Sequence, residues 1–290
     1  MRKIFFLLIT GLMISCGRNG ADSGNKIITV SIAPFKYFVE QIAGDDFTVN
    51  IMVPAGADPH IYEPFPEQIN KLRKSVAYIS NGYLGFEMNW LDRFYEANPA
   101  MKRLSLGDRI DALVSEHHHE GGHAEGADPH YWLSPKCALI IASSVKGLLC
   151  ELNPPHKQKY ETTYQLLISK IQEVDNKARE LLTDLPNKCF MIYHPNLAYV
   201  ARDYGLEEIP VEYEGKEPPP SRMRELIDRA RKDHLRTIFV QREYDTKNAK
   251  AIAGEIGAHI VMIDPLSENW QTSTTDIIDA LYKSLLESSK

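Results

Sequence analysis

Short apolar runs alternate along the chain with longer stretches whose apolar residues recur every three or four positions. The runs predict buried strands, and the stretches predict helices with one apolar face. The expected strands cover residues 27–33, 47–53, 76–80, 188–193, 237–241 and 259–264. The expected helices cover residues 35–43, 66–74, 86–97, 135–152, 197–204, 221–232 and 247–256. This alternation predicts an α/β protein in which helices flank parallel sheets.

One segment in the middle of the chain, residues 153–185, interrupts the alternation. Asn153-Pro154-Pro155 suits a helix start, because asparagine caps the first turn and proline fits within it. An apolar stripe then follows at alternating steps of four and three residues: Tyr160, Tyr164, Leu167, Ile171, Val174, Ala178 and Leu181. Some 30 helical residues form a rod of roughly 45 Å. We therefore expect a long rigid linking helix between an N-terminal lobe at residues 26–152 and a C-terminal lobe at residues 186–290.

The first residues predict export and anchoring. Met1-Arg2-Lys3 supplies positive charge before an apolar run at 4–14, which is short for a membrane span and typical of a secretory signal. Cys16 follows a small residue, as in the cleavage site of bacterial lipoproteins, where the cysteine carries the lipid. We expect a signal peptide at 1–15, then the lipidated Cys16 and a tether to residue 25. The alternative is an ordinary signal peptide with an incidental cysteine.

The rest of the chain changes the picture in two ways. No later stretch is long and apolar enough to be a membrane span, so we expect an extracytoplasmic body held at a membrane by its anchor, in the periplasm or at the cell surface. The formal net charge of −6 and the pI near 5.9 argue against nucleic-acid binding.

Candidate ligands stand beside prolines where expected strands and loops end. Ala57-Asp58-Pro59-His60 recurs as Ala127-Asp128-Pro129-His130. A lone histidine is more often a hydrogen-bonded structural residue, but the duplication favours a shared role for these two. Proline restricts its own backbone and that of its predecessor, so a ligand held there loses less entropy on binding.

Two further candidates, His194 and Asp264, each precede a proline and lie at the end of an expected strand in the C-terminal half. Ligands of open α/β sheets gather at the carboxyl ends of strands, so we expect all four candidates to meet between the lobes. Three imidazoles and one carboxylate suit Zn²⁺. Ca²⁺ and Mg²⁺ prefer oxygen ligands, and Mn²⁺ would fit a site richer in carboxylate.

Five segments together resemble the signatures of one protein family. They read HIYEP at 60–64, DPHYWLSP at 128–135, HPNLAYVARDYGL at 194–206, EGKEPPPS at 214–221 and DPL at 264–266. In this order they resemble the zinc/manganese substrate-binding proteins of ABC importers. The histidine at 194 and the acidic histidine-rich insertion before the second ligand resemble the zinc branch.

The resemblance implies two α/β lobes of parallel sheet bridged by the long helix, with a metal ion buried between them. It implies His60, His130 and His194 as ligands and Asp264 as the fourth, with Glu243, Glu63 or water as alternatives in the fourth place. It further implies that Zn²⁺, rather than Mn²⁺, is the ion carried, that an ABC permease and its ATPase are the partners, and that the protein is a monomer without enzymatic activity.

Residues 115–127 form a low-complexity insertion that contains His117, His118, His119 and His123. His119-Glu120-Gly121-Gly122-His123 also matches the HExxH pattern of helical metalloproteases. The two glycines cost such a helix about 2 kcal/mol relative to alanine, and no apolar stripe offsets that cost, so a protease is disfavoured. We expect either a solvated loop that collects or senses zinc, or an acidic loop without a role in binding.

The residues alone leave two other functions open. A zinc-dependent hydrolase would need an open coordination position and a general base such as Glu63 or Glu67. A metal-scavenging surface lipoprotein that works without a transporter would share every feature described above.

Overall fold

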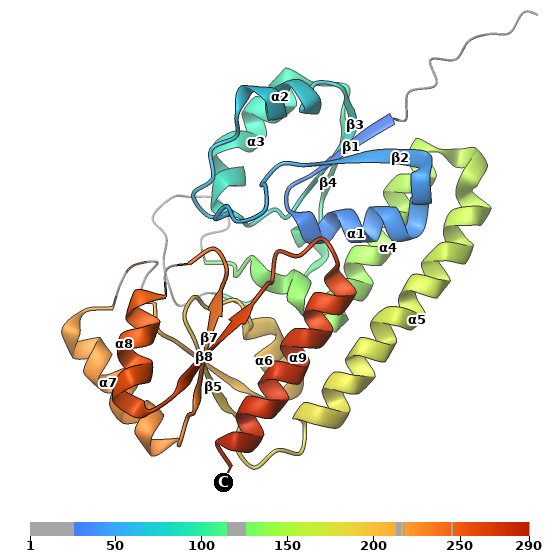
Figure 1. Ribbon diagram of the computed structural model, residues 1–290. Coiled ribbons are helices and arrows are strands. Elements are labelled where there is room, and N and C mark those ends of the chain that lie inside the picture. Colours follow the sequence, from blue (N-terminus) through green and yellow to red (C-terminus); the bar gives the residue numbers. More distant parts are fainter. Residues whose placement is uncertain (1–25, 115–125, 213–215, 217, 245, 290) are drawn as a thin grey trace, which may run out of the picture.

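The computed structural model describes residues 26–114, 126–212, 216, 218–244 and 246–289, which form two α/β lobes beside a long helix (Figure 1). Each lobe contains a parallel sheet of four strands, in the order β2-β1-β3-β4 in the first lobe and β6-β5-β7-β8 in the second. The first sheet comprises β1 (Lys26–Val30), β2 (Phe47–Ile51), β3 (Ser75–Ser80) and β4 (Lys102–Ser105). The second comprises β5 (Cys189–Ile192), β6 (Glu207–Pro210), β7 (Thr237–Gln241) and β8 (His259–Ile263).

Helices cover both sheets. The first lobe contains α1 (Ala33–Ala43), α2 (Pro66–Leu72), α3 (Gly85–Ala97) and α4 (Pro135–Leu152). The second contains α6 (Ala198–Tyr204), α7 (Pro220–Lys232), α8 (Lys247–Ile256) and α9 (Trp270–Glu287). Helices α1, α4 and α9 pack with the long helix α5 in one layer that runs along both lobes, while α2 and α3 pack together elsewhere on the first lobe and α7 and α8 on the second (Figure 1). Burial on two faces explains why the central strands read as continuous apolar runs.

Helix α5 (Lys157–Leu182) joins the two lobes and contacts both. Its buried residues are Tyr160, Leu167, Ile171, Val174, Ala178 and Leu182. They follow the predicted stripe with two exceptions: Tyr164 is only partly buried, and Leu182 takes the place of Leu181. Lys170 on this helix donates to Gln41 of α1 over 2.7 Å, and Lys177 pairs with Asp279 of α9 over 2.7 Å. The predicted fold class, two lobes of parallel sheet joined by one long helix, is confirmed.

Three elements did not show in the hydrophobic pattern: β4, β6 and α9. Strands β4 and β6 lie at the edges of their sheets and have only four residues each. An edge strand pairs with a neighbour along only one side of its backbone, so polar residues such as Lys102 and Glu207 are tolerated there and weaken the strand signal.

Among the described residues, no helix is both long and apolar enough to cross a bilayer. The predicted signal, Cys16 and the tether lie outside the described residues.

Two tryptophans connect the lobes close to the predicted ligands. Trp132 lies in a short 3₁₀ helix, η3 (His130–Leu133), and its indole donates to the Pro265 carbonyl over 2.9 Å. Trp270, at the start of α9, donates to the Trp132 carbonyl over 2.6 Å. Both indoles are buried, so these bonds hold the loop after β8 against the turn that carries His130.

Candidate metal centre

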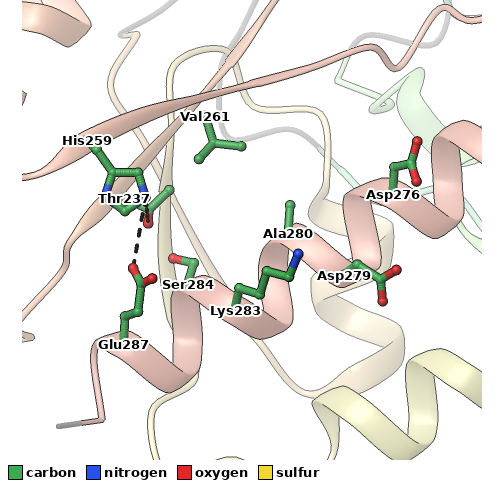
Figure 2. Close-up of a pocket in the computed structure, with 9 residues that line it drawn as sticks. All are labelled: Thr237, His259, Val261, Asp276, Asp279, Ala280, Lys283, Ser284 and Glu287. Carbon is green, nitrogen blue, oxygen red and sulfur yellow. Dashed lines mark hydrogen bonds and ion pairs between the residues drawn. The ribbon is translucent and has the colours of Figure 1, made fainter.

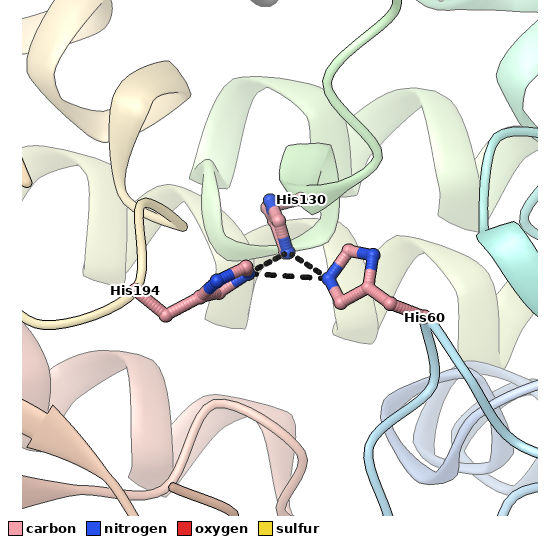
Figure 3. Close-up of side chains that lie close together, drawn as sticks. All are labelled: His60, His130 and His194. Atoms are coloured by element: carbon pink, nitrogen blue, oxygen red, sulfur yellow. Dashed lines mark hydrogen bonds between the residues drawn. The ribbon is translucent and has the colours of Figure 1, made fainter. Parts of the chain in front are cut away.

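The three predicted histidine ligands meet at the junction of the lobes, although 134 residues separate the first from the last. His60 lies in the loop after β2, His130 begins η3 and His194 follows β5, and Figure 3 shows their rings directed toward one point. The Nε2 atoms of His60 and His130 lie 3.1 Å apart, those of His60 and His194 3.2 Å, and those of His130 and His194 3.3 Å.

The triangle of Nε2 atoms has the size of one face of a tetrahedral zinc site. Zinc binds imidazole nitrogen at about 2.0–2.1 Å, which places neighbouring ligand nitrogens about 3.3–3.4 Å apart. The observed separations of 3.1–3.3 Å agree with that spacing to within a few tenths of an ångström. His130 and His194 are 5% and 8% exposed, so a bound ion would be largely removed from water.

The repeated tetrapeptide forms the same hydrogen-bonded turn at both positions. The Oδ1 atom of Asp58 accepts the backbone N–H of His60 over 2.8 Å, and Asp128 accepts that of His130 over the same distance. An aspartate that bonds the amide two residues ahead fixes the backbone of a turn. The repeat therefore presents each histidine from a stiff local frame.

Carboxylates orient two of the three rings. The Nδ1 atom of His130 lies 2.8 Å from Asp128 Oδ1, and that of His194 lies 2.5 Å from Glu212 Oε2. Because an ionised carboxylate only accepts, the proton of each neutral ring belongs on Nδ1 and the lone pair on Nε2 faces the other rings. Such lone pairs repel one another, and a cation between them converts the repulsion into attraction.

Glu212 was not among the predicted site residues, and strand pairing explains its position. Strands β5 and β6 are parallel, with Ile192 opposite Pro210, so His194 and Glu212 lie opposite each other two residues further on. The Glu212 amide donates to the Tyr193 carbonyl over 2.9 Å and continues the ladder. Only the recognition of β6 as the neighbour of β5 could have revealed this residue from the sequence.

A buried carboxylate supports the N-terminal ligand loops. Glu87 on α3 is fully buried and accepts the backbone N–H groups of Asn81 and Gly82 over 3.0 and 2.6 Å. The Asn81 side chain in turn donates to the Pro129 carbonyl, next to His130, over 2.9 Å. Burial raises the pKa of Glu87 to about 7, despite these hydrogen bonds.

Comparisons with known proteins identify a family for the chain. A family model described as "ZnuA: Zinc-uptake complex component A periplasmic" matches residues 28–287. The chain belongs to this family. The resemblance drawn from the sequence motifs is thereby confirmed, and the family is one of solute-binding transport components rather than of enzymes.

Individual proteins and solved structures are similar to this chain over most of its length. A crystal structure of ZnuA superposes with a TM-score of 0.84 at 36% identity and covers 90% of this chain and 100% of its own. The high-affinity zinc uptake system protein ZnuA of Bacillus subtilis is 26% identical over 299 residues, covering 97% of this chain and 92% of that protein. The zinc-binding lipoprotein AdcA of Streptococcus pneumoniae is 26% identical over 289 residues, which are 94% of this chain but only 57% of AdcA.

The candidates for the fourth ligand, Asp264, Glu243 and Glu63, lie outside the cluster of three histidines. Among the described residues, the group of three or more potential ligand atoms that all lie within 4.8 Å of one another consists of the three histidines and includes none of these carboxylates. Asp264 follows β8 as expected, and its carboxylate pairs with the Arg242 guanidinium over 3.1 Å. Glu243 follows β7, and burial raises the pKa of its carboxyl, with the charges of Asp264 and Asp58 adding to the rise. Glu63 is exposed.

Two remaining features lie away from the three histidines or outside the described residues. The auxiliary candidates His117, His118, His119 and His123 belong to the undescribed segment 115–125. A separate cavity lies between α9 and the strands β7 and β8, with Thr237 and His259 at the first residues of these strands among the residues that line it (Figure 2). There, His259 lies 3.3 Å from the Thr237 hydroxyl and 3.9 Å from the Glu287 carboxylate. In the described part of the chain no third potential ligand atom joins these two, so this cavity does not offer the three donors that His60, His130 and His194 offer.

Proposed function

We propose that this protein captures Zn²⁺ between its lobes outside the cytoplasm and delivers it to an ABC permease driven by its ATPase. The observation that carries this proposal is the triangle of Nε2 atoms from His60, His130 and His194, with edges of 3.1–3.3 Å. Membership of the zinc-uptake component A family supports the transport role.

The donor set supports zinc over manganese as the ion that is carried. Imidazole nitrogens favour a borderline ion such as Zn²⁺, whereas Mn²⁺ favours carboxylate and water oxygens. The nearby carboxylates of Asp128 and Glu212 bond to ring nitrogens, which strengthens the imidazoles as donors and balances the charge of the ion.

We propose Asp264 as the fourth ligand, with Glu243, Glu63 or a water molecule as the alternatives. Asp264 lies in the loop after β8, which the Trp132 indole binds through the Pro265 carbonyl. This loop is held against the turn of His130, so Asp264 lies close to the junction of the lobes before the ion binds. To bind the ion, its carboxylate must exchange the Arg242 guanidinium for the metal. A carboxylate paired with an arginine until the ion arrives avoids an uncompensated negative charge at the junction.

Delivery requires the lobes to separate, because two of the three ligands are buried. We propose that docking on the permease opens the junction and that a lipid on Cys16 keeps the protein near its partner, which raises the effective concentration for docking. In this scheme His117, His118, His119 and His123 form an auxiliary loop that collects zinc without providing the tight site.

Native mass spectrometry with metal analysis on the purified mature protein tests the proposal. We expect a monomer that retains one zinc ion per chain and prefers zinc when manganese competes. Replacing both His60 and His130 with alanine should abolish tight binding, whereas deletion of residues 115–127 should remove only weaker equivalents. Retention of zinc by the double variant, or loss of the tight site on deletion, would refute the ligand assignment.

A further inference from the structure

The loop that carries His60, between β2 and α2, is tied at both ends by one side chain. Gln68 lies in the first turn of α2. Its Nε2 atom donates to the Met52 carbonyl over 2.5 Å, where the loop begins. Its Oε1 atom accepts the Phe65 amide over 2.8 Å, where the loop ends. A loop closed at both ends has fewer conformations than one that is free, so Gln68 restricts the positions open to His60.

The same side chain also bonds within the loop. The Tyr62 hydroxyl donates to Gln68 Oε1 over 2.6 Å, and Tyr62 follows His60 by two residues. The Tyr62 ring packs edge-on against Phe86 of α3, with ring centroids 6.2 Å apart. The Phe86 amide in turn donates to the Pro59 carbonyl over 3.4 Å. His60 therefore lies between two residues, Pro59 and Tyr62, that are held from α2 and α3.

Capping of α2 accounts for only one of the three bonds that Gln68 makes. A glutamine at the third helical position that accepts the amide of the N-cap residue satisfies the start of a helix. The bonds to Met52 and Tyr62 satisfy nothing in α2, because both partners precede the helix. The set needs a donor and an acceptor on one side chain, since the Met52 carbonyl only accepts and the Phe65 amide only donates. Glutamine provides both, whereas ionised glutamate and methionine do not.

We propose that Gln68 is a positioning residue that holds His60 in place for zinc before the ion arrives. The inference rests on the proposed function, because it concerns binding of zinc by the same three histidines. When a ligand occupies its binding position for only part of the time, the apparent Kd rises by the inverse of that fraction. A loop released by Gln68 that keeps His60 in place about one-tenth of the time would weaken zinc binding about tenfold.

Two substitutions at this position remove different bonds. Gln68→Met keeps an unbranched side chain of similar helix propensity and removes all three bonds, so it should raise the zinc Kd about tenfold or more. Gln68→Glu keeps both acceptor bonds but places an oxygen against the Met52 carbonyl, so it should raise the zinc Kd about threefold to tenfold.

Asn98→Leu is the matched control, because Asn98 is another amide that ties a turn of the same lobe. Its Nδ2 atom donates to the carbonyls of Arg73 over 3.1 Å and Ser75 over 2.8 Å, where the chain passes from α2 to β3. Because the strands are parallel, this turn before β3 lies at the opposite end of the sheet from the loop after β2. The substitution should therefore lower the stability of the lobe without changing the zinc Kd.

The zinc Kd is measured by chelator competition, and amide hydrogen exchange across residues 52–65 is measured on each metal-free variant together with its melting temperature. A raised Kd and faster exchange in the loop of Gln68→Met, with a wild-type Kd in Asn98→Leu, support the inference. A Kd raised equally in Asn98→Leu would overturn it, since the effect would then come from the stability of the lobe. Wild-type Kd values in both Gln68 variants would also overturn it and leave the proposed function intact, whereas a wild-type protein that holds no zinc would refute both.

Discussion

Replacing Glu212 with glutamine tests whether a carboxylate behind the metal ligand strengthens the site. Glu212 lies 2.5 Å from Nδ1 of His194, and both side chains are about 10% exposed, so water and salt screen this contact little. Glutamine can still accept the Nδ1–H through its carbonyl oxygen. The substitution therefore removes the negative charge and retains the orientation of the ring.

The magnitude follows from the type of hydrogen bond. A hydrogen bond to a charged group contributes about 1.5–3 kcal/mol and one between neutral groups about 0.5–1.5 kcal/mol. The difference of about 1–1.5 kcal/mol corresponds to a zinc Kd that rises about fivefold to tenfold. Glu212→Ala also removes the acceptor, so the ring can turn or change tautomer. We expect the Kd of that variant to rise roughly 10–100-fold.

The assay is competition for zinc against a chelator of known affinity at pH 7.5 and fixed ionic strength. Glu207→Gln is the matched control, because Glu207 lies on β6 five residues before Glu212, is exposed and pairs with Arg229 over 2.8 Å. The control should bind zinc as the wild type does. Equal zinc affinities for the wild type, Glu212→Gln and Glu212→Ala would refute the view that this carboxylate tunes His194.

Three further predictions concern the loop of His60, the fourth ligand and pH. Gly85→Ala should weaken zinc binding about tenfold or more, because a Cβ there would lie 2.4 Å from the His60 carbonyl oxygen. Gly147→Ala on α4 is the control, because open space surrounds that position, and it should leave zinc binding unchanged. Asp264→Ala should raise the zinc Kd if Asp264 replaces Arg242 with the ion as its partner, and Arg242→Ala should lower it. Zinc affinity should fall below about pH 6.5, because imidazole must be neutral to coordinate. Chelator competition, repeated from pH 8 to pH 5, measures all three.

Each of these predictions has a distinct contrary result. Wild-type affinity in Gly85→Ala would mean that the His60 loop tolerates displacement. Unchanged affinity in Asp264→Ala would assign the fourth position to Glu243, Glu63 or water. A flat affinity between pH 8 and pH 5 would argue against imidazole ligands altogether.

Local features of the sequence determined much of this protein. The apolar stripe on α5 predicted which residues face the lobes, since a helix brings residues three or four positions apart onto one side wherever it packs. The repeated Ala-Asp-Pro-His predicted two ligands, because the aspartate and the proline fix the turn within four residues. The motif at His194 completed the set through its resemblance to a family.

Only the tertiary structure decided what surrounds those ligands. Glu212 faces His194 because β6 pairs with β5 in one register, and the Tyr244 ring stacks on the same imidazole because the loop after β7 lies beside the loop after β5. Asp264 faces Arg242 because the loops after β7 and β8 lie side by side. Each of these contacts joins segments that lie far apart in the sequence, and their spacing depends on strand register and lobe packing rather than on any local preference of the chain.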